Sequence, residues 1–139
     1  TEEVLRSVYN ELALQNVWLE GTLLKPNMVI SGQDCAEQAD VQEVAERTLR
    51  CLKRTVPAAV PGIVFLSGAQ SDEPATAHLN AMNKMGPLPW KLSFSYGRAL
   101  QAAPLKAWAG KAANLDKGQQ AFLKRAMDNA AAAQGKYAA

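Results

Sequence analysis

The sequence predicts an α/β protein in which three parallel strands alternate with helices. Short apolar runs rich in β-branched residues stand between longer segments whose apolar residues recur at helical spacing. Strands that are apolar on both faces are typical of parallel sheets, and helices between them are typical of βαβ crossovers. Three such strands form either a small open sheet or part of an eight-stranded barrel.

Local signals delimit each element. Asn16 closes the first helix, Gly21 interrupts the first strand and Pro26 ends it. Ser71 is the expected N-cap of the third helix, which has acidic residues in its first turn. Pro104 is expected to begin a new helix, because it would break an established one. The predicted helices span 2–15, 41–54, 72–84, 98–109 and 115–134, and the predicted strands span 17–24, 62–68 and 90–97.

Several side chains are expected to be structural. The single histidine, His78, lies on a predicted helix and is expected to be structural or exposed, not a catalytic base. Cys35 and Cys51 are expected to be free thiols. The tryptophans Trp18, Trp90 and Trp108 are expected to pack instead of stacking on a ligand. The helix faces expected to pack on the sheet carry Val4, Leu5, Val8 and Leu12, and Val44, Thr48, Leu49 and Leu52.

The composition narrows the class of protein. A chain of 139 residues is the size of one domain, and 15 basic against 13 acidic residues give a net charge of +2, which argues against nucleic acid as a partner. Two cysteines make neither a disulfide framework nor a metal cluster and fit a reducing compartment. No apolar run approaches the roughly 20 residues of a membrane span, so no membrane insertion is expected. The start, TEEVLRSVYNEL, lacks a signal-peptide pattern and opens inside a predicted helix, so we expect the chain to be a piece of a longer protein.

Three strand ends carry the candidate site. Lys25, Ser67–Gly68 and Gly97–Arg98 each follow the carboxyl end of a predicted strand. In parallel α/β proteins ligand sites form at this edge, and glycines and helix N-termini there suit a phosphate group. Each feature alone is more often a solvated lysine, a simple turn or a surface charge. Together they predict a phosphate site beside a strand-end lysine.

Longer strings resemble a known family. VWLEGTLLKPN, residues 17–27, is similar to the Schiff-base signature of class I fructose-bisphosphate aldolases at every position. The resemblance continues in RTVPAAVPGIVFLSG, LNAMNK, PWKLSFSYGRALQ and LKAWAGK, and covers nearly the whole chain. It implies the C-terminal part of a (β/α)8 TIM barrel, with strands 6, 7 and 8 and their helices in residues 1–139 and the earlier strands missing.

The resemblance also implies the chemistry. The family's lysine at the position of Lys25 forms an imine with the substrate ketone, and the imine accepts the electrons of the breaking C3–C4 bond. An apolar strand favours the neutral amine that attacks. The residues matching Ser67, Gly68, Gly97 and Arg98 bind the phosphate of the dihydroxyacetone phosphate half. No metal and no cofactor is implied, and the family's acid/base carboxylates lie upstream of this chain.

Some positions depart from the family pattern. Relatives usually have glycine where this chain has Ala69, which would be strained if the position requires a positive φ. Pro104 stands where alanine or threonine is usual, and the family's C-terminal tail, which ends in a tyrosine that reaches the active site, is absent; Tyr137 is not assigned its role. The isolated piece is expected to be inactive and to need the rest of the barrel for stability, because three strands leave an open edge.

The resemblance implies a glycolytic and gluconeogenic enzyme that acts on fructose 1,6-bisphosphate. It also implies a sugar-phosphate substrate, a homotetramer and a cytoplasmic protein, with a plastid form as an alternative. Fructose 1-phosphate and sedoheptulose bisphosphate remain alternative substrates. A non-catalytic fragment or a scaffold that binds actin filaments or adhesin tails remains an alternative function.

Overall fold

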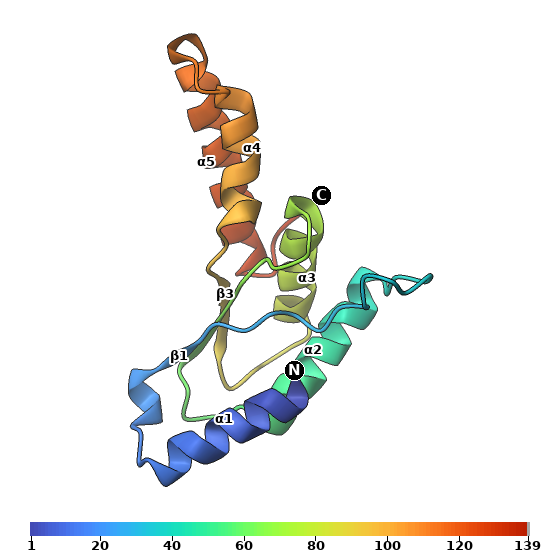
Figure 1. Ribbon diagram of the computed structural model, residues 1–139, viewed down its shortest axis with the longest axis vertical. Helices are drawn as coiled ribbons and strands as arrows, with labels where there is room; N and C mark the ends of the chain where they lie inside the picture. Colours follow the sequence, from blue (N-terminus) through green and yellow to red (C-terminus); the bar gives the residue numbers. More distant parts are fainter. Residues whose placement is uncertain (139) are drawn as a thin grey trace.

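A computed structural model describes residues 1–138, as three central strands with helices around them (Figure 1). The elements are α1 (Glu2–Leu14), a 3-10 turn (Leu19–Gly21), β1 (Leu23–Leu24), α2 (Val41–Thr55), β2 (Gly62–Phe65), α3 (Asp72–Lys84), β3 (Lys91–Phe94), α4 (Arg98–Trp108), a second 3-10 turn (Ala112–Asn114) and α5 (Leu115–Ala132).

The strands form one parallel sheet in the order β1-β2-β3, which confirms the predicted α/β class. Leu24 pairs with Ile63, and Phe65 pairs with Phe94. Backbone pairing continues beyond the strand ends. The Leu66 N–H donates to the Pro26 carbonyl at 3.0 Å, and the Ser95 N–H donates to the Phe65 carbonyl at 2.8 Å. The three chain segments therefore stay in register up to the carboxyl edge of the sheet.

The core lies between one face of the sheet and the helices α2, α3 and α5. Ile63 and Phe65 on β2 are fully buried, and so are Leu79 and Met82 on α3. Asp40 caps α2, because its side chain accepts from the Glu43 N–H at 2.8 Å. The expected packing face of α2 is confirmed, since its members are all buried: Val44, Thr48, Leu49 and Leu52.

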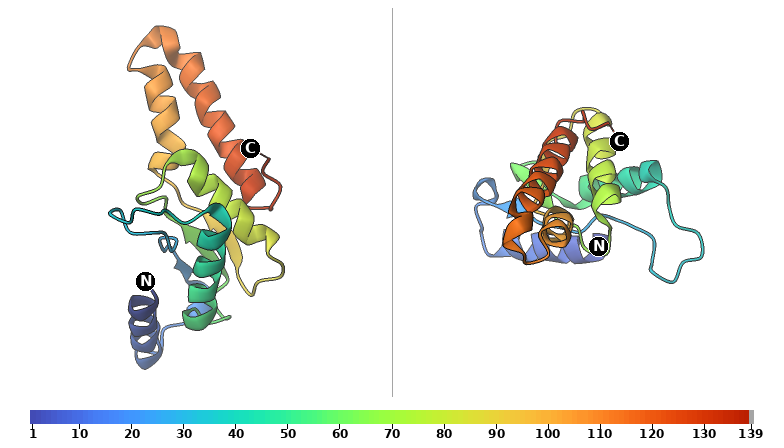
Figure 2. Two further views of the ribbon diagram at one scale, coloured as in Figure 1. Left: turned by 90° about the vertical axis from the view of Figure 1, so that its right-hand side faces the viewer. Right: turned by 90° about the horizontal axis from the view of Figure 1, so that it is seen from above.

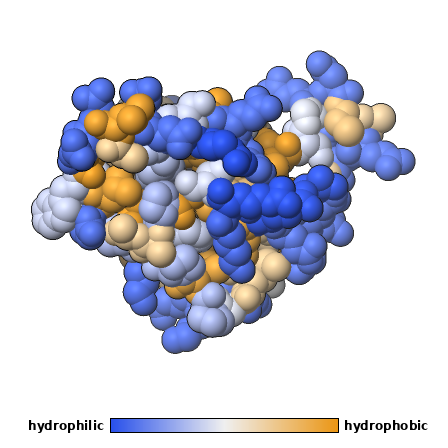
Figure 3. Space-filling model, turned by 90° about the horizontal axis from the view of Figure 1, so that it is seen from below, coloured by the Kyte–Doolittle hydropathy of each residue, from blue (hydrophilic) through white to orange (hydrophobic). Residues whose placement is uncertain are grey.

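The other face of the sheet is open within the described residues. Leu23 on β1 is 63% exposed, and a Cβ on its partner Gly62 would lie 3.0 Å from a Leu23 methyl carbon, so both project to the same side. Side chains alternate between the faces of a strand, so this side is opposite to that of the buried Ile63. Seen from below, the surface of the molecule mixes hydrophobic and hydrophilic residues (Figure 3).

The first helix packs differently from its prediction. α1 contacts α2, and it buries Leu5 and Tyr9. Val4 and Val8 are 63% and 42% exposed, so the expectation that they pack on the sheet is wrong. The helical period is present, but only a narrow stripe of α1 meets α2, and the neighbouring positions are left uncovered.

The first strand is much shorter than the predicted 17–24. Local hydrogen bonds form the 3-10 turn in its place: the Gly21 N–H donates to the Trp18 carbonyl, and the Thr22 hydroxyl and N–H both donate to the Leu19 carbonyl at 2.8 and 3.0 Å. A threonine side chain that bonds to a nearby carbonyl competes with the strand ladder in this way.

α4 and α5 form a helical hairpin that projects from the sheet (Figures 1 and 2). Pro104 lies inside α4, so the prediction that it begins a helix is wrong. Proline removes one helical hydrogen bond, and packing along α5 offsets this loss. Gly118 of α5 permits the close approach, since a Cβ there would lie 3.0 Å from the Trp108 Cβ and 3.5 Å from the Pro104 carbonyl.

The tryptophans divide into two kinds. Trp90 is buried as predicted, and its indole N–H donates to the Pro57 carbonyl at 3.0 Å. Trp18 is 74% exposed, so its predicted packing is wrong for the described residues, whereas Trp108 is 40% exposed and packs against Gly118 of α5. Cys35 and Cys51 are free thiols, as predicted. Across residues 1–138, no helix has the length and hydropathy that crossing a membrane requires.

Candidate functional site

The predicted site residues lie along the carboxyl edge of the sheet. Lys25 follows β1 directly, Ser67 and Gly68 lie in the loop between β2 and α3, and Gly97 and Arg98 join β3 to α4. The Arg98 guanidinium donates to the Gly68 carbonyl, so the loops after β2 and β3 are in direct contact.

Lys25 lies directly after β1, the edge strand of the sheet. It comes two residues after Leu23, on a segment whose pairing with β2 continues to Pro26. Strand alternation therefore places Lys25 on the open face with Leu23, away from the helices. Its side chain is exposed, and so the amine is accessible from that face.

The loop after β2 has one left-handed residue. Gly68 has φ +49°, a conformation that glycine adopts without steric cost, and the Gln70 N–H closes the turn by donating to the Ser67 carbonyl at 3.0 Å. Among residues 1–138, the non-glycine residues with positive φ are Asn16 and Ala109. Ala69 is therefore unstrained, and the possible penalty for replacing the usual glycine does not arise.

A buried histidine anchors this loop to α3. His78 is 7% exposed, and its Nδ1 shares a short hydrogen bond with the Gln70 side-chain oxygen. Burial lowers the pKa of His78, so the ring is neutral and Nδ1 carries the donated proton. The expected structural role of His78 is confirmed.

The loop after β3 leads straight into a helix. Gly97 precedes α4, and its carbonyl accepts from the N–H groups of Leu100 and Gln101 at 3.1 and 3.0 Å. A Cβ at Gly97 would meet no atom within 4 Å, so the space beside this helix N-terminus is open. The unpaired N–H groups of a first helical turn, together with the macrodipole, favour an anion.

Tyr96 ties the same loop to α3. Its hydroxyl donates to the Ala75 carbonyl at 2.9 Å, and its ring centroid lies 5.5 Å from that of Phe94. Burial raises the pKa of the Tyr96 phenol far above its usual range, so the group remains a protonated donor. Sequence reasoning treated Tyr96 only as a strand residue.

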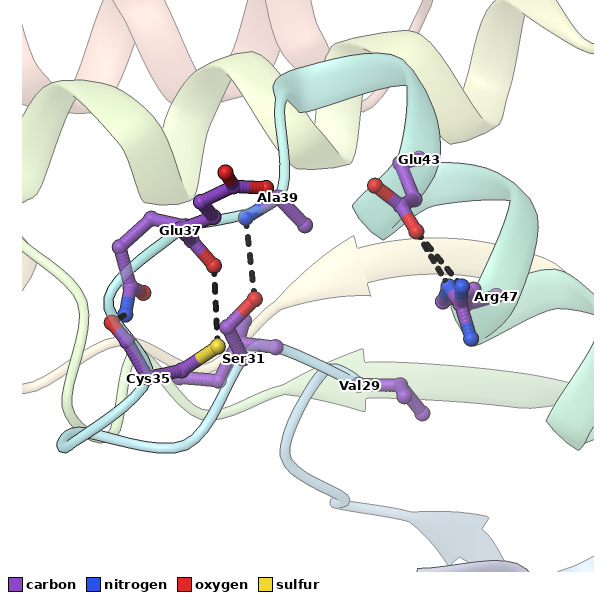
Figure 4. A pocket seen from close by; sticks show the side chains of 9 residues that line it. Val29, Ser31, Cys35, Glu37, Ala39, Glu43 and Arg47 are labelled. Carbon is purple, nitrogen blue, oxygen red and sulfur yellow. Dashed lines mark hydrogen bonds and ion pairs between the residues drawn. The ribbon is translucent and has the colours of Figure 1, made fainter.

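A hollow of about 460 Å³ lies away from this edge, between the loop after β1 and the start of α2 (Figure 4). Much of its polar lining is internally bonded: the Cys35 thiol donates to the Glu37 carbonyl at 3.1 Å, and the Ser31 hydroxyl accepts from the Ala39 N–H at 2.9 Å. Over the described part of the chain, no group of three or more His, Cys, Asp and Glu side chains could hold a metal ion.

The geometry thus combines an accessible amine with two glycine loops, an arginine and the N-termini of α3 and α4. The loops after β2 and β3 are joined by contact, and Lys25 lies one strand away from the first of them. Sequence reasoning found these residues from strand ends and glycines. It missed two groups that hold the loops, namely Tyr96 and the His78–Gln70 pair.

Comparison with known proteins gives a consistent assignment. The family model of class-I fructose-bisphosphate aldolase matches residues 1–139. A probable fructose-bisphosphate aldolase class 1 of Xylella fastidiosa is 60% identical over 138 residues, which are 99% of this chain and 41% of the relative. Human fructose-bisphosphate aldolase B is 59% identical over 138 residues, 99% of this chain and 38% of its own length.

A solved structure agrees with the observed fold. The fructose-bisphosphate aldolase of Plasmodium falciparum, determined with TRAP and a small-molecule inhibitor, superposes with a TM-score of 0.96 at 50% identity. The match covers 99% of this chain and 40% of that one, and three parallel strands with their helices are consistent with part of a barrel. The chain thus spans about two fifths of the length of these relatives, and it belongs to the class-I fructose-bisphosphate aldolase family.

Proposed function

We propose that the protein containing this chain cleaves fructose 1,6-bisphosphate reversibly to dihydroxyacetone phosphate and glyceraldehyde 3-phosphate. The observation that carries the proposal is the position of Lys25, at the same sheet edge as the contacting Ser67–Gly68 and Gly97–Arg98 loops. A lysine amine and a phosphate site at adjacent strand ends fit a phosphorylated ketone.

Lys25 is the proposed nucleophile. Its neutral amine adds to the ketone carbon, and loss of water leaves a protonated imine. A base takes the proton of the C4 hydroxyl as the C3–C4 bond breaks, and the protonated imine takes up the electron pair of that bond, which releases the aldehyde and leaves an enamine. Lys25 is exposed in the described residues, so its amine can be reached by a ketone from the open face of the sheet.

The two loops are the proposed phosphate site. The first-turn N–H groups of α4 and the Arg98 guanidinium offer donors to phosphate oxygens, and a charge-assisted arginine fork is stronger than neutral bonds. The Arg98 guanidinium is already held beside this site by its bond to the Gly68 carbonyl, and it has further N–H donors for an anion.

Borohydride trapping tests the proposal. The intact protein is incubated with dihydroxyacetone phosphate, reduced and digested, and the modified lysine is identified by mass spectrometry. We expect the label on the peptide that contains Lys25, and we expect Lys25→Arg, which keeps the charge, to remove both the label and turnover. Label on another lysine, or full activity of Lys25→Arg, would refute the assignment.

Relative turnover on fructose 1-phosphate and sedoheptulose bisphosphate tests the substrate choice. We further propose that the intact protein is a cytoplasmic homotetramer, which light scattering and cell fractionation test. The residues 1–139 alone are expected to lack turnover, because the family's acid/base groups lie outside them.

A second function is partner binding. The observation that favours it is the match to an aldolase solved in complex with TRAP, over 99% of this chain. Such binding uses a surface and not the imine, so Lys25→Arg is expected to retain sedimentation with actin filaments and capture by an adhesin-tail peptide. Failure of the wild-type protein in both binding assays would refute this function.

A further inference from the structure

One buried arginine on α5 joins three helices. Arg125 is 6% exposed. Its Nε donates to the Ala99 carbonyl at 3.0 Å, and one Nη2 donates to the Asp72 carbonyl at 2.8 Å and to the Thr76 hydroxyl at 2.7 Å. Its other terminal nitrogen lies 3.6 Å from a carboxylate oxygen of Asp128.

The two carbonyl acceptors, of Ala99 and Asp72, lie in the first turns of the helices that follow the phosphate loops. Ala99 comes directly after Arg98 in α4, and Asp72 begins α3, shortly after Gly68. One planar guanidinium therefore fixes both helix N-termini relative to each other and to α5. The α3 and α4 starts are held by the same group, although they are separated in the sequence.

Hydrogen bonds around Arg125 complete a closed network. The Thr76 hydroxyl donates to the Asn129 side-chain oxygen at 2.8 Å, and the Asn129 amide donates to the Arg125 carbonyl at 2.8 Å. Asn129 and Thr76 are fully buried. Across the described residues, no buried side-chain nitrogen or oxygen lacks a partner.

We propose that Arg125 is a positioning residue for the phosphate site, which acts through the N-termini of α3 and α4. This inference rests on the function proposed above. The phosphate-binding N–H groups belong to the same turns whose carbonyls Arg125 holds, so loss of the fork lets the Gly68 and Gly97 loops move apart. Lys25 follows β1, and no hydrogen bond within the described residues joins it to Arg125, Thr76 or Asn129, so imine chemistry itself stays intact.

The choice of arginine supports a role in geometry. A buried ion is weak evidence for stability, because apolar side chains of similar volume often replace buried ion pairs without loss. A lysine at this position keeps the charge, but a single ammonium lacks the rigid fork that spans the Ala99 and Asp72 carbonyls. Arg125→Lys therefore keeps the positive charge and removes the double contact with the Ala99 and Asp72 carbonyls.

The test compares two ketones in the intact protein. Dihydroxyacetone phosphate carries the phosphate, whereas dihydroxyacetone has the same ketone without it. Borohydride trapping at Lys25 is measured as a function of the concentration of each. For Arg125→Lys we expect the half-saturating concentration of dihydroxyacetone phosphate to rise about tenfold, since small misplacement of binding groups is costly, while dihydroxyacetone trapping is unchanged. Arg47→Lys is the matched control, because Arg47 is exposed and its ion pair among residues 1–138 is with Glu43 of the same helix, α2.

The outcomes are distinct. Equal behaviour of Arg125→Lys and wild type, or equal losses with both ketones, overturns the positioning role. Absence of trapping in the wild type with either ketone instead overturns the proposed function. Thr76→Val, which removes the hydroxyl's bonds to Arg125 and Asn129 but leaves Arg125 bonded to the Ala99 and Asp72 carbonyls, is expected to give a smaller loss confined to the phosphorylated ketone. If Arg125→Lys does not fold, an unchanged response of Thr76→Val overturns the inference.

Discussion

The left-handed conformation of Gly68 makes the loop after β2 the most informative place to perturb the phosphate site. Gly68 has φ +49°, and an added Cβ would lie 3.0 Å from a methyl carbon of Leu66. The left-handed region costs an L-residue about 1–2 kcal/mol. The Leu66 contact adds little, because the end of a flexible side chain can move by a few tenths of an ångström.

Gly68→Ala therefore has a defined expected size. In Gly68→Ala the loop relaxes to an unstrained conformation and has to return to the native turn when the phosphate binds. The cost of about 1–2 kcal/mol then appears as a weakening of phosphate binding by about 5- to 30-fold. The assay is the KM of the intact enzyme for fructose 1,6-bisphosphate, with trapping of dihydroxyacetone as the reference for unaltered imine chemistry.

Ala69→Gly is the matched control on the neighbouring residue. Ala69 does not have a positive φ, so restoring the family's usual glycine relieves no strain. We expect an unchanged KM and a loss of stability of about 0.4–1 kcal/mol from the greater freedom of the unfolded chain. A clear decrease in KM for Ala69→Gly, or an unchanged KM for Gly68→Ala, would refute this reasoning.

Further predictions concern stability. Phe65→Ala removes a fully buried ring from β2 and is expected to lower the free energy of unfolding by about 3–5 kcal/mol in urea titrations, whereas Val4→Ala at an exposed position has little effect; similar losses would contradict the assigned core. Burial lowers the pKa of His78, so the unfolded state binds more protons. Stability should therefore fall as the pH drops below the ordinary value of 6.5, and His78→Gln should flatten this dependence in urea midpoints. If the pH dependence of stability is unchanged in His78→Gln, groups other than His78 cause it. The isolated residues 1–139 are expected to associate and to lack a cooperative thermal transition, because one sheet face and the sheet edges are uncovered in the described residues; a monomer with a sharp transition would contradict this.

Helix positions were the most predictable part of the fold. The prediction of a helix over 41–54 corresponds to α2, Val41–Thr55, and the prediction over 72–84 matches α3 at both ends. An apolar period defines both helices locally, and Ser71 was the expected start of the second, whereas the Asp40 cap of α2 was found only in the structure. Ser71 is the N-cap residue, although its side chain makes no capping bond.

Strand length and the continuity of α4 were not predictable from the sequence alone. The segment 17–24 is apolar enough for a strand, but the bonds of Thr22 to Leu19 close a turn within it. Pro104 is a helix breaker by its local chemistry, yet it lies within α4 because α5 packs along that helix. Both outcomes depend on which competing hydrogen bonds and contacts the surrounding chain supplies.

The sequence by itself determined the α/β class, the family resemblance and the order of chemistry-bearing groups at the strand ends: Lys25, then Ser67–Gly68, then Gly97–Arg98. These features are local or follow from short strings. Only the tertiary structure decided that Arg98 meets the Gly68 carbonyl, that Ala69 is unstrained, and that Arg125 holds the first turns of α3 and α4. A buried hydrogen-bond network joins residues far apart in the chain, so its partners exist only once the helices have packed.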